Sequence, residues 1–103
     1  MTQLLATPER FYGKPIYTYG YLELGPGGSA GLAPSPATFE ANDTVGCIQV
    51  SSYAAGPREA PGALDQEGTY VVQIAGDLSP PDKELCVGRL SNATITGIRR
   101  LGP

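Results

Sequence analysis

IYTYGYLEL, residues 16–24, alternates aromatic with aliphatic residues, and this period of two is typical of a β-strand. Successive side chains of a strand point to opposite faces of the sheet. One face of this strand carries three aromatic residues, Tyr17, Tyr19 and Tyr21. The other carries aliphatic ones, chiefly Ile16, Leu22 and Leu24. A chain of 103 residues has one small core, so we expect a second partner to cover one of the two faces.

The rest of the chain repeats this strand-like composition in shorter runs. They are rich in Val, Ile, Thr and Tyr and separated by Gly, Pro, Asn or Asp. The runs that we interpret as strands are residues 37–40, 44–53, 68–76, 83–90 and 92–101, with a tight link at Ser91-Asn92. About six short strands at this spacing predict an all-β fold, a small barrel or sandwich.

The domain organisation predicted from these runs is simple. Residues 1–15 form an N-terminal arm, and residues 16–103 form a single β domain. A Gly/Pro-rich loop occupies residues 25–36, where GPGGSAGLAPSP offers little to bury and many residues that resist regular structure.

The arm is too short to have a core of its own. Thr7-Pro8 is a suitable start for one helical turn, but Gly13 and Pro15 end it at once. We therefore expect an extended arm that becomes ordered by lying on something else. Its apolar residues are Leu4, Leu5, Phe11 and Tyr12.

Composition and charge exclude several classes of partner. The chain contains 14 Gly and 10 Pro, only 17% charged residues, and a net charge of −3 with a pI near 4.7. Nucleic-acid binding requires a basic surface, so we expect no nucleic-acid partner. No run approaches the ~18 apolar residues of a membrane span, so we expect no membrane partner.

The two cysteines are interpreted through the compartment. The first ten residues, MTQLLATPER, lack the basic region and the long apolar stretch of a secretory signal, which predicts synthesis in a cytoplasm. We therefore expect Cys47 and Cys86 to be reduced thiols inside apolar strands instead of a disulfide. Two Cys without any His are too few ligands for a structural zinc site.

Residues suited to catalysis are missing. Histidine, the usual proton carrier near neutral pH, is absent. The acidic residues gather in turns, and the glycines of residues 25–28 are not followed by the Lys and Ser or Thr of a phosphate-binding loop. The sequence thus predicts no enzyme activity, no catalytic or metal-binding residues and no cofactor.

The remaining function is binding to another protein. An exposed row of tyrosines would mark an interaction surface, although the arm, through Phe11 and Tyr12, is an alternative cover within the same chain. We favour a neighbouring subunit, because Tyr is enriched at interfaces. The candidate interface residues are Leu4, Leu5, Phe11, Tyr12, Tyr17, Tyr19 and Tyr21.

One stretch resembles a known family. GTYVVQIAGDLSPPDKELCVGRLSNATITG, residues 68–97, and the preceding TVGCIQVSS are similar to segments of the small decoration or cement proteins of tailed-phage capsids. Members of that family are small and β-rich, often carry a poorly ordered N-terminal arm, and bind capsid surfaces as trimers. The resemblance implies a structural virion protein on the capsid exterior, made in the host cytoplasm, with the major capsid protein and itself as partners.

Two other classes remain open at this point. A small carbohydrate- or ligand-binding β-module would use the tyrosines to stack on sugar rings. A vertex protein of a bacterial compartment would form pentamers instead of trimers.

Overall fold

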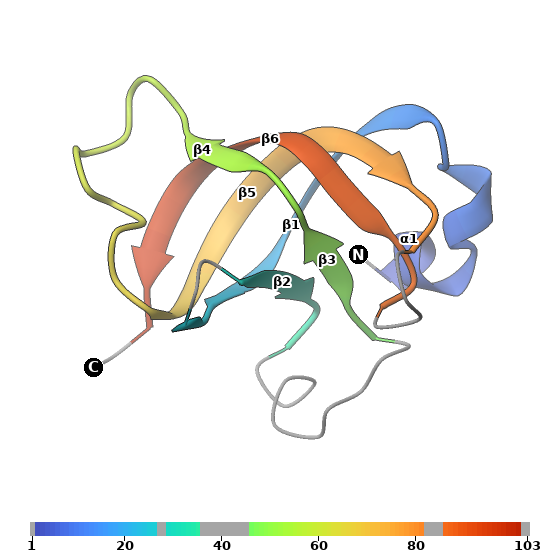
Figure 1. Ribbon diagram of the computed structural model, residues 1–103, viewed down its shortest axis with the longest axis horizontal. Coiled ribbons are helices and arrows are strands. Elements are labelled where there is room, and N and C mark those ends of the chain that lie inside the picture. Colours follow the sequence, from blue (N-terminus) through green and yellow to red (C-terminus); the bar gives the residue numbers. More distant parts are fainter. Residues whose placement is uncertain (1, 27–28, 36–45, 82–85, 102–103) are drawn as a thin grey trace.

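The structure is a computed structural model that describes residues 2–26, 29–35, 46–81 and 86–101. Two short helices come first, α1 (Thr2–Ala6) and the 3-10 helix η1 (Pro8–Arg10). The strands follow: β1 (Lys14–Leu24), β2 (Ala30–Ala33), β3 (Ile48–Val50), β4 (Tyr53–Ala55), β5 (Gly68–Ser79) and β6 (Arg89–Arg100). The all-β prediction is confirmed, and of its two forms the barrel is the one observed (Figure 1).

Five of the strands close into the barrel. The order β3-β2-β1-β5-β6 is antiparallel throughout, and a parallel pairing of β3 with β6 closes the ring. The sixth strand, β4, pairs with the same edge of β6 as β3 does, a few residues further along β6. Strands β5, β1, β2 and β3 lie in the order of a Greek key, an arrangement shared with the OB-fold. Barrels of this kind support unrelated activities, so the architecture alone assigns no function.

The core fills the inside of the barrel. On β1 the inward residues include Thr18, Gly20, Leu22 and Leu24, whereas Tyr17 and its alternating neighbours point outward. Small residues at Thr18 and Gly20 suit the narrow interior of a small barrel. The largest fully buried side chains are Leu22, Leu32, Ile48, Tyr70, Val72, Ile74, Leu78, Leu90 and Ile95.

The observed strands differ from the predicted ones at three places. β2 lies within the predicted loop at 25–36, where Leu32 and Ala33 are buried. The predicted strand at 44–53 is observed as β3 and the start of β4, and the predicted strand at 37–40 lies outside the described residues. The predicted strands at 83–90 and 92–101 are one strand, β6, which begins at Arg89 and runs through Ser91-Asn92 without interruption; residues 86–88 precede it, and residues 83–85 lie outside the described ranges.

A bulge explains why Ser91-Asn92 has the composition of a turn. Asn92 has a φ of 52°, and the register between β5 and β6 shifts between Ala75 and Asp77 on the facing strand. The Asn92 backbone N–H donates to Ser52 Oγ at 2.9 Å, and its side-chain amide donates to Asp77 Oδ2 at 3.3 Å. Bulges of this kind bend a strand and increase its twist, which a small closed barrel requires.

Gly76 of β5, which faces the bulge of β6, is expected to tolerate no side chain. A Cβ at this position would lie 2.8 Å from Ser91 O and 3.2 Å from Ala93 Cα, so the backbone of β6 would have to move. We expect Gly76→Ala to lower the free energy of unfolding by about 2–3 kcal/mol, measured by urea denaturation. Thr94→Ala, at an exposed position on the facing strand β6, is the control and should change it by less than about 0.5 kcal/mol. Equal stability of the two variants would contradict this packing.

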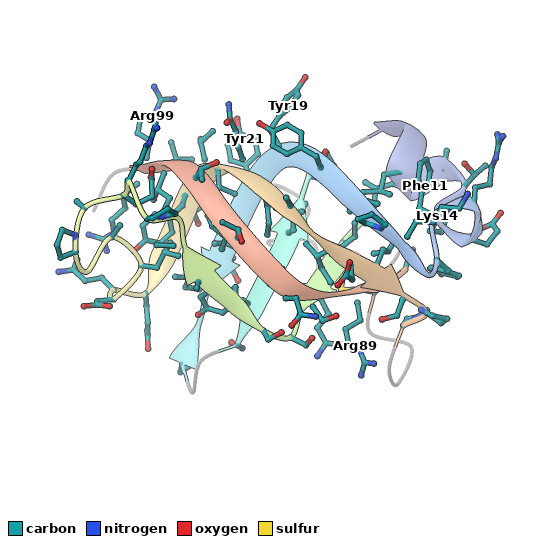
Figure 2. The ribbon with its side chains drawn as sticks, turned by 90° about the horizontal axis from the view of Figure 1, so that it is seen from above. Phe11, Lys14, Tyr19, Tyr21, Arg89 and Arg99 are labelled. Atoms are coloured by element: carbon teal, nitrogen blue, oxygen red, sulfur yellow. A yellow bond between two sulfur atoms is a disulfide. The ribbon has the colours of Figure 1, made fainter. Side chains whose placement is uncertain are left out.

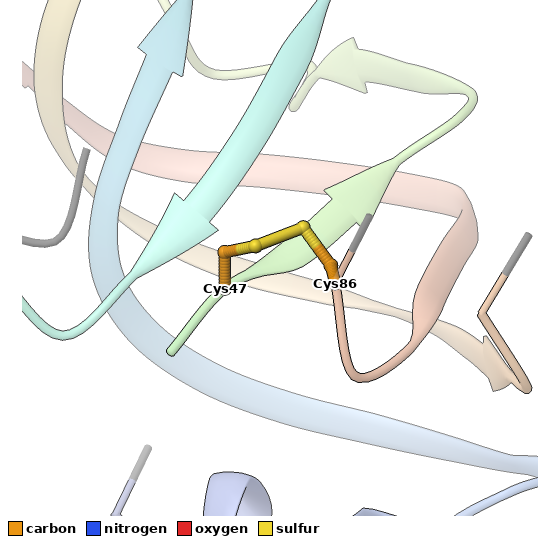
Figure 3. Close-up of a disulfide and its surroundings, with 2 residues drawn as sticks. All are labelled: Cys47 and Cys86. Carbon is orange, nitrogen blue, oxygen red and sulfur yellow. A yellow bond between two sulfur atoms is a disulfide. The ribbon is translucent and has the colours of Figure 1, made fainter. Parts of the chain in front are cut away.

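The cysteines correct one prediction. Cys47 and Cys86, which are 39 positions apart in sequence, are joined by a disulfide, with 5.0 Å between their Cα atoms. Neither lies inside a strand, because Cys47 immediately precedes β3 and Cys86 lies three residues before β6 (Figure 3). The prediction of two reduced thiols was wrong. It relied on the compartment of synthesis, which gives no information about which side chains lie close together in the fold. The bond lies next to the parallel β3–β6 seam, which consists of the pairs Gln49↔Arg89 and Val50↔Leu90.

The N-terminal arm corrects a second prediction. It is not extended, because α1 and η1 fold back onto one end of the barrel (Figure 1). Leu4 is only 7% exposed and belongs to the core, and Leu5, Phe11 and Tyr12 pack against it. The Tyr12 hydroxyl donates to Val87 O at 2.6 Å. The chain's own barrel therefore orders the arm, and the expectation that a neighbouring molecule is needed for this was wrong.

Leu4 is consequently a stability residue. Truncating a buried leucine removes apolar contacts and leaves a cavity, so Leu4→Ala should lower the free energy of unfolding by about 2–3 kcal/mol. Glu9→Ala, an exposed change in the same arm, should change it by less than about 0.5 kcal/mol. Urea denaturation followed by circular dichroism measures both, and an unaffected Leu4→Ala would show that the arm does not contribute to the core.

Candidate interaction surface

The outward face of β1 and β5 carries the predicted aromatic row. We define the tyrosine surface as Tyr17, Tyr19 and Tyr21 of β1 together with Gln73 of β5. Tyr19 is paired with Gln73 across the two strands. The alternation of β1 places the three rings outward because their neighbours in sequence fill the barrel. The aliphatic face of β1 is therefore covered by the rest of the barrel, and its aromatic face is on the outside.

Two of the rings are strongly exposed. Tyr17 is 66% and Tyr19 is 71% exposed, whereas Tyr21 is half-buried. In the part of the chain that the structure describes, these two are the large hydrophobic side chains that remain exposed. Figure 2 shows Tyr19 and Tyr21 projecting from the same side of the barrel, with Arg99 on that side near the end of β6. The surface is therefore aromatic with a cation at its margin.

The tyrosine surface is held in place by the sheet beneath it. The Tyr17 hydroxyl donates to Gln73 Oε1 at 2.9 Å, which connects the two strands diagonally. β1 is paired with β5 along its whole length, from Lys14↔Leu78 to Leu24↔Gly68. A side chain on a continuous ladder loses little backbone freedom on binding, so the tyrosine surface is suited to a protein partner.

The predicted interface residues fall into two separate groups. Tyr17, Tyr19 and Tyr21 lie together on the outer face, as the alternation predicted. The arm residues are packed on the chain's own core instead, and Figure 2 shows Phe11 at one end of the barrel, away from Tyr19 and Tyr21. The tyrosine surface is thus the part of the predicted interface that remains available to a partner.

A second feature was not predicted. A cleft at the other end of the barrel is lined by Leu24, Gly25, Tyr53, Leu64, Asp65, Gln66 and Glu67. The segment 54–67 is rich in Pro and in charges of both signs, which is the composition of a solvated loop and gives no sign of a cleft. Leu64 could have indicated the cleft, because it is an apolar residue between two charged stretches. In the structure it packs against the core.

Other types of site receive no support from the described ranges. They contain no group of three or more His, Cys, Asp or Glu side chains placed to hold a metal ion. None of the described helices has the length and hydropathy needed to cross a membrane. No protein-family model, curated protein sequence or solved structure matches this chain.

Proposed function

We propose that this chain is a capsid decoration protein, which binds the major capsid protein through the tyrosine surface and stabilises the particle by protein–protein contacts. The observation that carries the proposal is the exposure of Tyr17 and Tyr19, 66% and 71%, on a closed and cross-linked barrel. Exposed aromatic groups of this kind mark interaction sites, since they bury a large area with few rotatable bonds.

Two further features support this proposal. Residues 68–97, which resemble segments of capsid decoration proteins, lie in β5, β6 and the connection between them. The Cys47–Cys86 bond suits a small protein on the outside of a particle, because virion surfaces are oxidising environments in which disulfides persist. Synthesis in a host cytoplasm and a disulfide in the released particle are therefore compatible.

We also propose that the chain acts as a homotrimer. A domain of 10.7 kDa buries a small core, and symmetric association adds stability to such a domain by burying part of its surface. Closed cyclic symmetry repeats the tyrosine surface on each subunit, so one trimer presents several copies to a capsid lattice.

The experiment combines native mass with capsid binding. Purified protein is weighed by native mass spectrometry and then sedimented with capsids from which the accessory proteins have been removed. The proposal expects a trimer and saturable binding to stripped capsids, with little binding to capsids that retain their accessory proteins. A pentamer that ignores capsids would favour a compartment vertex protein. A monomer that binds saccharides and ignores capsids would favour a carbohydrate-binding module, and either result would overturn the proposal.

A further inference from the structure

The cleft at the far end of the barrel is open to solvent and large enough to receive one side chain of a partner. It has a volume of about 350 Å³ and is lined in part by residues 64–67. Figure 1 shows this segment at the end of the barrel opposite the N-terminal helices. Leu24 and Leu64 supply apolar contact, and Tyr53 contributes an aromatic ring. The remaining side chains of the lining are polar: Asp65, Gln66 and Glu67.

The polar wall of the cleft is anchored by its backbone. The buried Tyr70 donates its hydroxyl hydrogen bond to Gln66 O, and Arg100 Nη2 donates to Glu67 O at 2.9 Å. The Asp65 N–H donates to Gly62 O at 3.1 Å. Because the carbonyls and the amide are bonded to neighbouring groups, the side chains on this wall are presented from a fixed backbone, which lowers the ordering cost of binding.

The charge of the lining indicates the class of ligand. Asp65 and Glu67 both line the cleft, and among the described residues neither carboxylate is in an ion pair. Arg100 donates to the Glu67 carbonyl oxygen and is not part of the lining. An aromatic ring beside two carboxylates favours a planar organic cation, because guanidinium binds carboxylates in a fork and stacks on aromatic faces.

We propose that this cleft binds a cationic side chain, arginine above all, that a partner protein presents. The occupant is inferred from the proposed role in protein–protein binding, and the preference for a cation is measured without any partner. In a capsid complex the cleft would add a charge-specific contact at a place separate from the tyrosine surface, whose contact is aromatic. Such a contact contributes more to the choice of partner than to total affinity.

The test is an NMR titration of the ¹⁵N-labelled full chain with Nα-acetyl-arginine methylamide. We expect shifts confined to residues 24–25, 53 and 64–67, with millimolar affinity. Nα-acetyl-citrulline methylamide has the same shape without the charge and should bind at least about tenfold more weakly. Higher salt should weaken the arginine probe and not the citrulline probe. Equal binding of the two probes, shifts elsewhere on the barrel, or no shifts with the arginine probe would each overturn the inference.

A pair of matched variants tests whether the carboxylate of Glu67 binds the arginine probe. Glu67→Gln should weaken the arginine probe about five- to tenfold. Glu23→Gln, which changes an exposed carboxylate outside the cleft lining, should leave its affinity unchanged. Equal losses in both variants would indicate a general charge effect and overturn the site. Tyr17→Ser with Tyr19→Ser should preserve the arginine titration, so a failure of capsid binding and a failure of the cleft are seen separately.

Discussion

Tyr17→Ser combined with Tyr19→Ser is expected to weaken binding to stripped capsids by about 100- to 1000-fold. An aromatic anchor at the centre of an interface contributes about 2 kcal/mol or more when it is truncated, and two adjacent anchors together account for this range. The loss should appear in the dissociation rate, because rings on the fixed β1–β5 ladder bind without much rearrangement. Co-sedimentation titrations and the rate of release from capsids measure both quantities.

Two controls distinguish the contribution of the aromatic rings to binding from that of the hydroxyl groups and from any loss of stability. Tyr17→Phe with Tyr19→Phe keeps the aromatic area and removes the hydrogen bond from Tyr17 to Gln73 Oε1, so it should retain most of the affinity. Because both rings are mainly exposed, the serine variant should unfold within about 1 kcal/mol of the natural chain. Tight binding by the folded serine variant would exclude the tyrosine surface as the capsid contact.

Removal of the disulfide should produce the largest loss of stability. The bond closes a loop of 39 positions, and the chain-entropy relation assigns about 4 kcal/mol to a cross-link of that length. Cys47→Ser with Cys86→Ser is therefore expected to lower the free energy of unfolding by about this amount, a large part of the 5–15 kcal/mol typical of a domain. Urea denaturation measures the change.

The reduced natural chain is the matched control for this variant. It keeps both sulfur atoms and removes only the cross-link, so it should lose the same stability as the double serine variant. Hydrogen exchange should accelerate most at Gln49 and Ser51, whose N–H groups donate to Gly88 O and Leu90 O across the seam. A reduced chain as stable as the oxidised one would show that β3 and β6 hold the barrel closed without the bond.

The sequence predicted the strands whose alternation is regular and missed those with weak patterns. β1 was recognised because its aromatic and aliphatic residues alternate over nine positions, 16–24. β2 was missed because Ala30-Gly31-Leu32-Ala33 has low strand propensity, and it is a strand because it pairs with β1 on one side and β3 on the other. Asn92 was predicted to lie in a turn because Asn tolerates a positive φ, which turns often require. The residue does have a positive φ, but it lies in a bulge within β6.

The sequence predicted part of the candidate surface: Tyr17, Tyr19 and Tyr21 lie together on it, whereas the four arm residues predicted with them pack on the chain's own core. Periodicity showed that β1 has two faces, but it does not distinguish which one a barrel encloses. The face of β1 that points into the barrel carries Thr18 and Gly20. Residues this small do not suggest a core in the sequence, but they fit the interior because the barrel is narrow. The cleft depends on residues 24–25, 53 and 64–67 meeting at one end, a long-range relation that no local pattern contains.

The long pairing of β1 with β5 has a consequence for how the chain folds. Leu24 pairs with Gly68, 44 positions later, and Lys14 pairs with Leu78, 64 positions later, so this ladder forms only after large loops have closed. β5 and β6, by contrast, are separated by residues 80–88 alone. The β5–β6 hairpin is therefore the expected nucleus, and the strand that carries the tyrosines joins late, in milliseconds to seconds. Until it does, the aliphatic face of β1 is exposed together with its aromatic face, and this is the interval in which the new chain is most prone to aggregate.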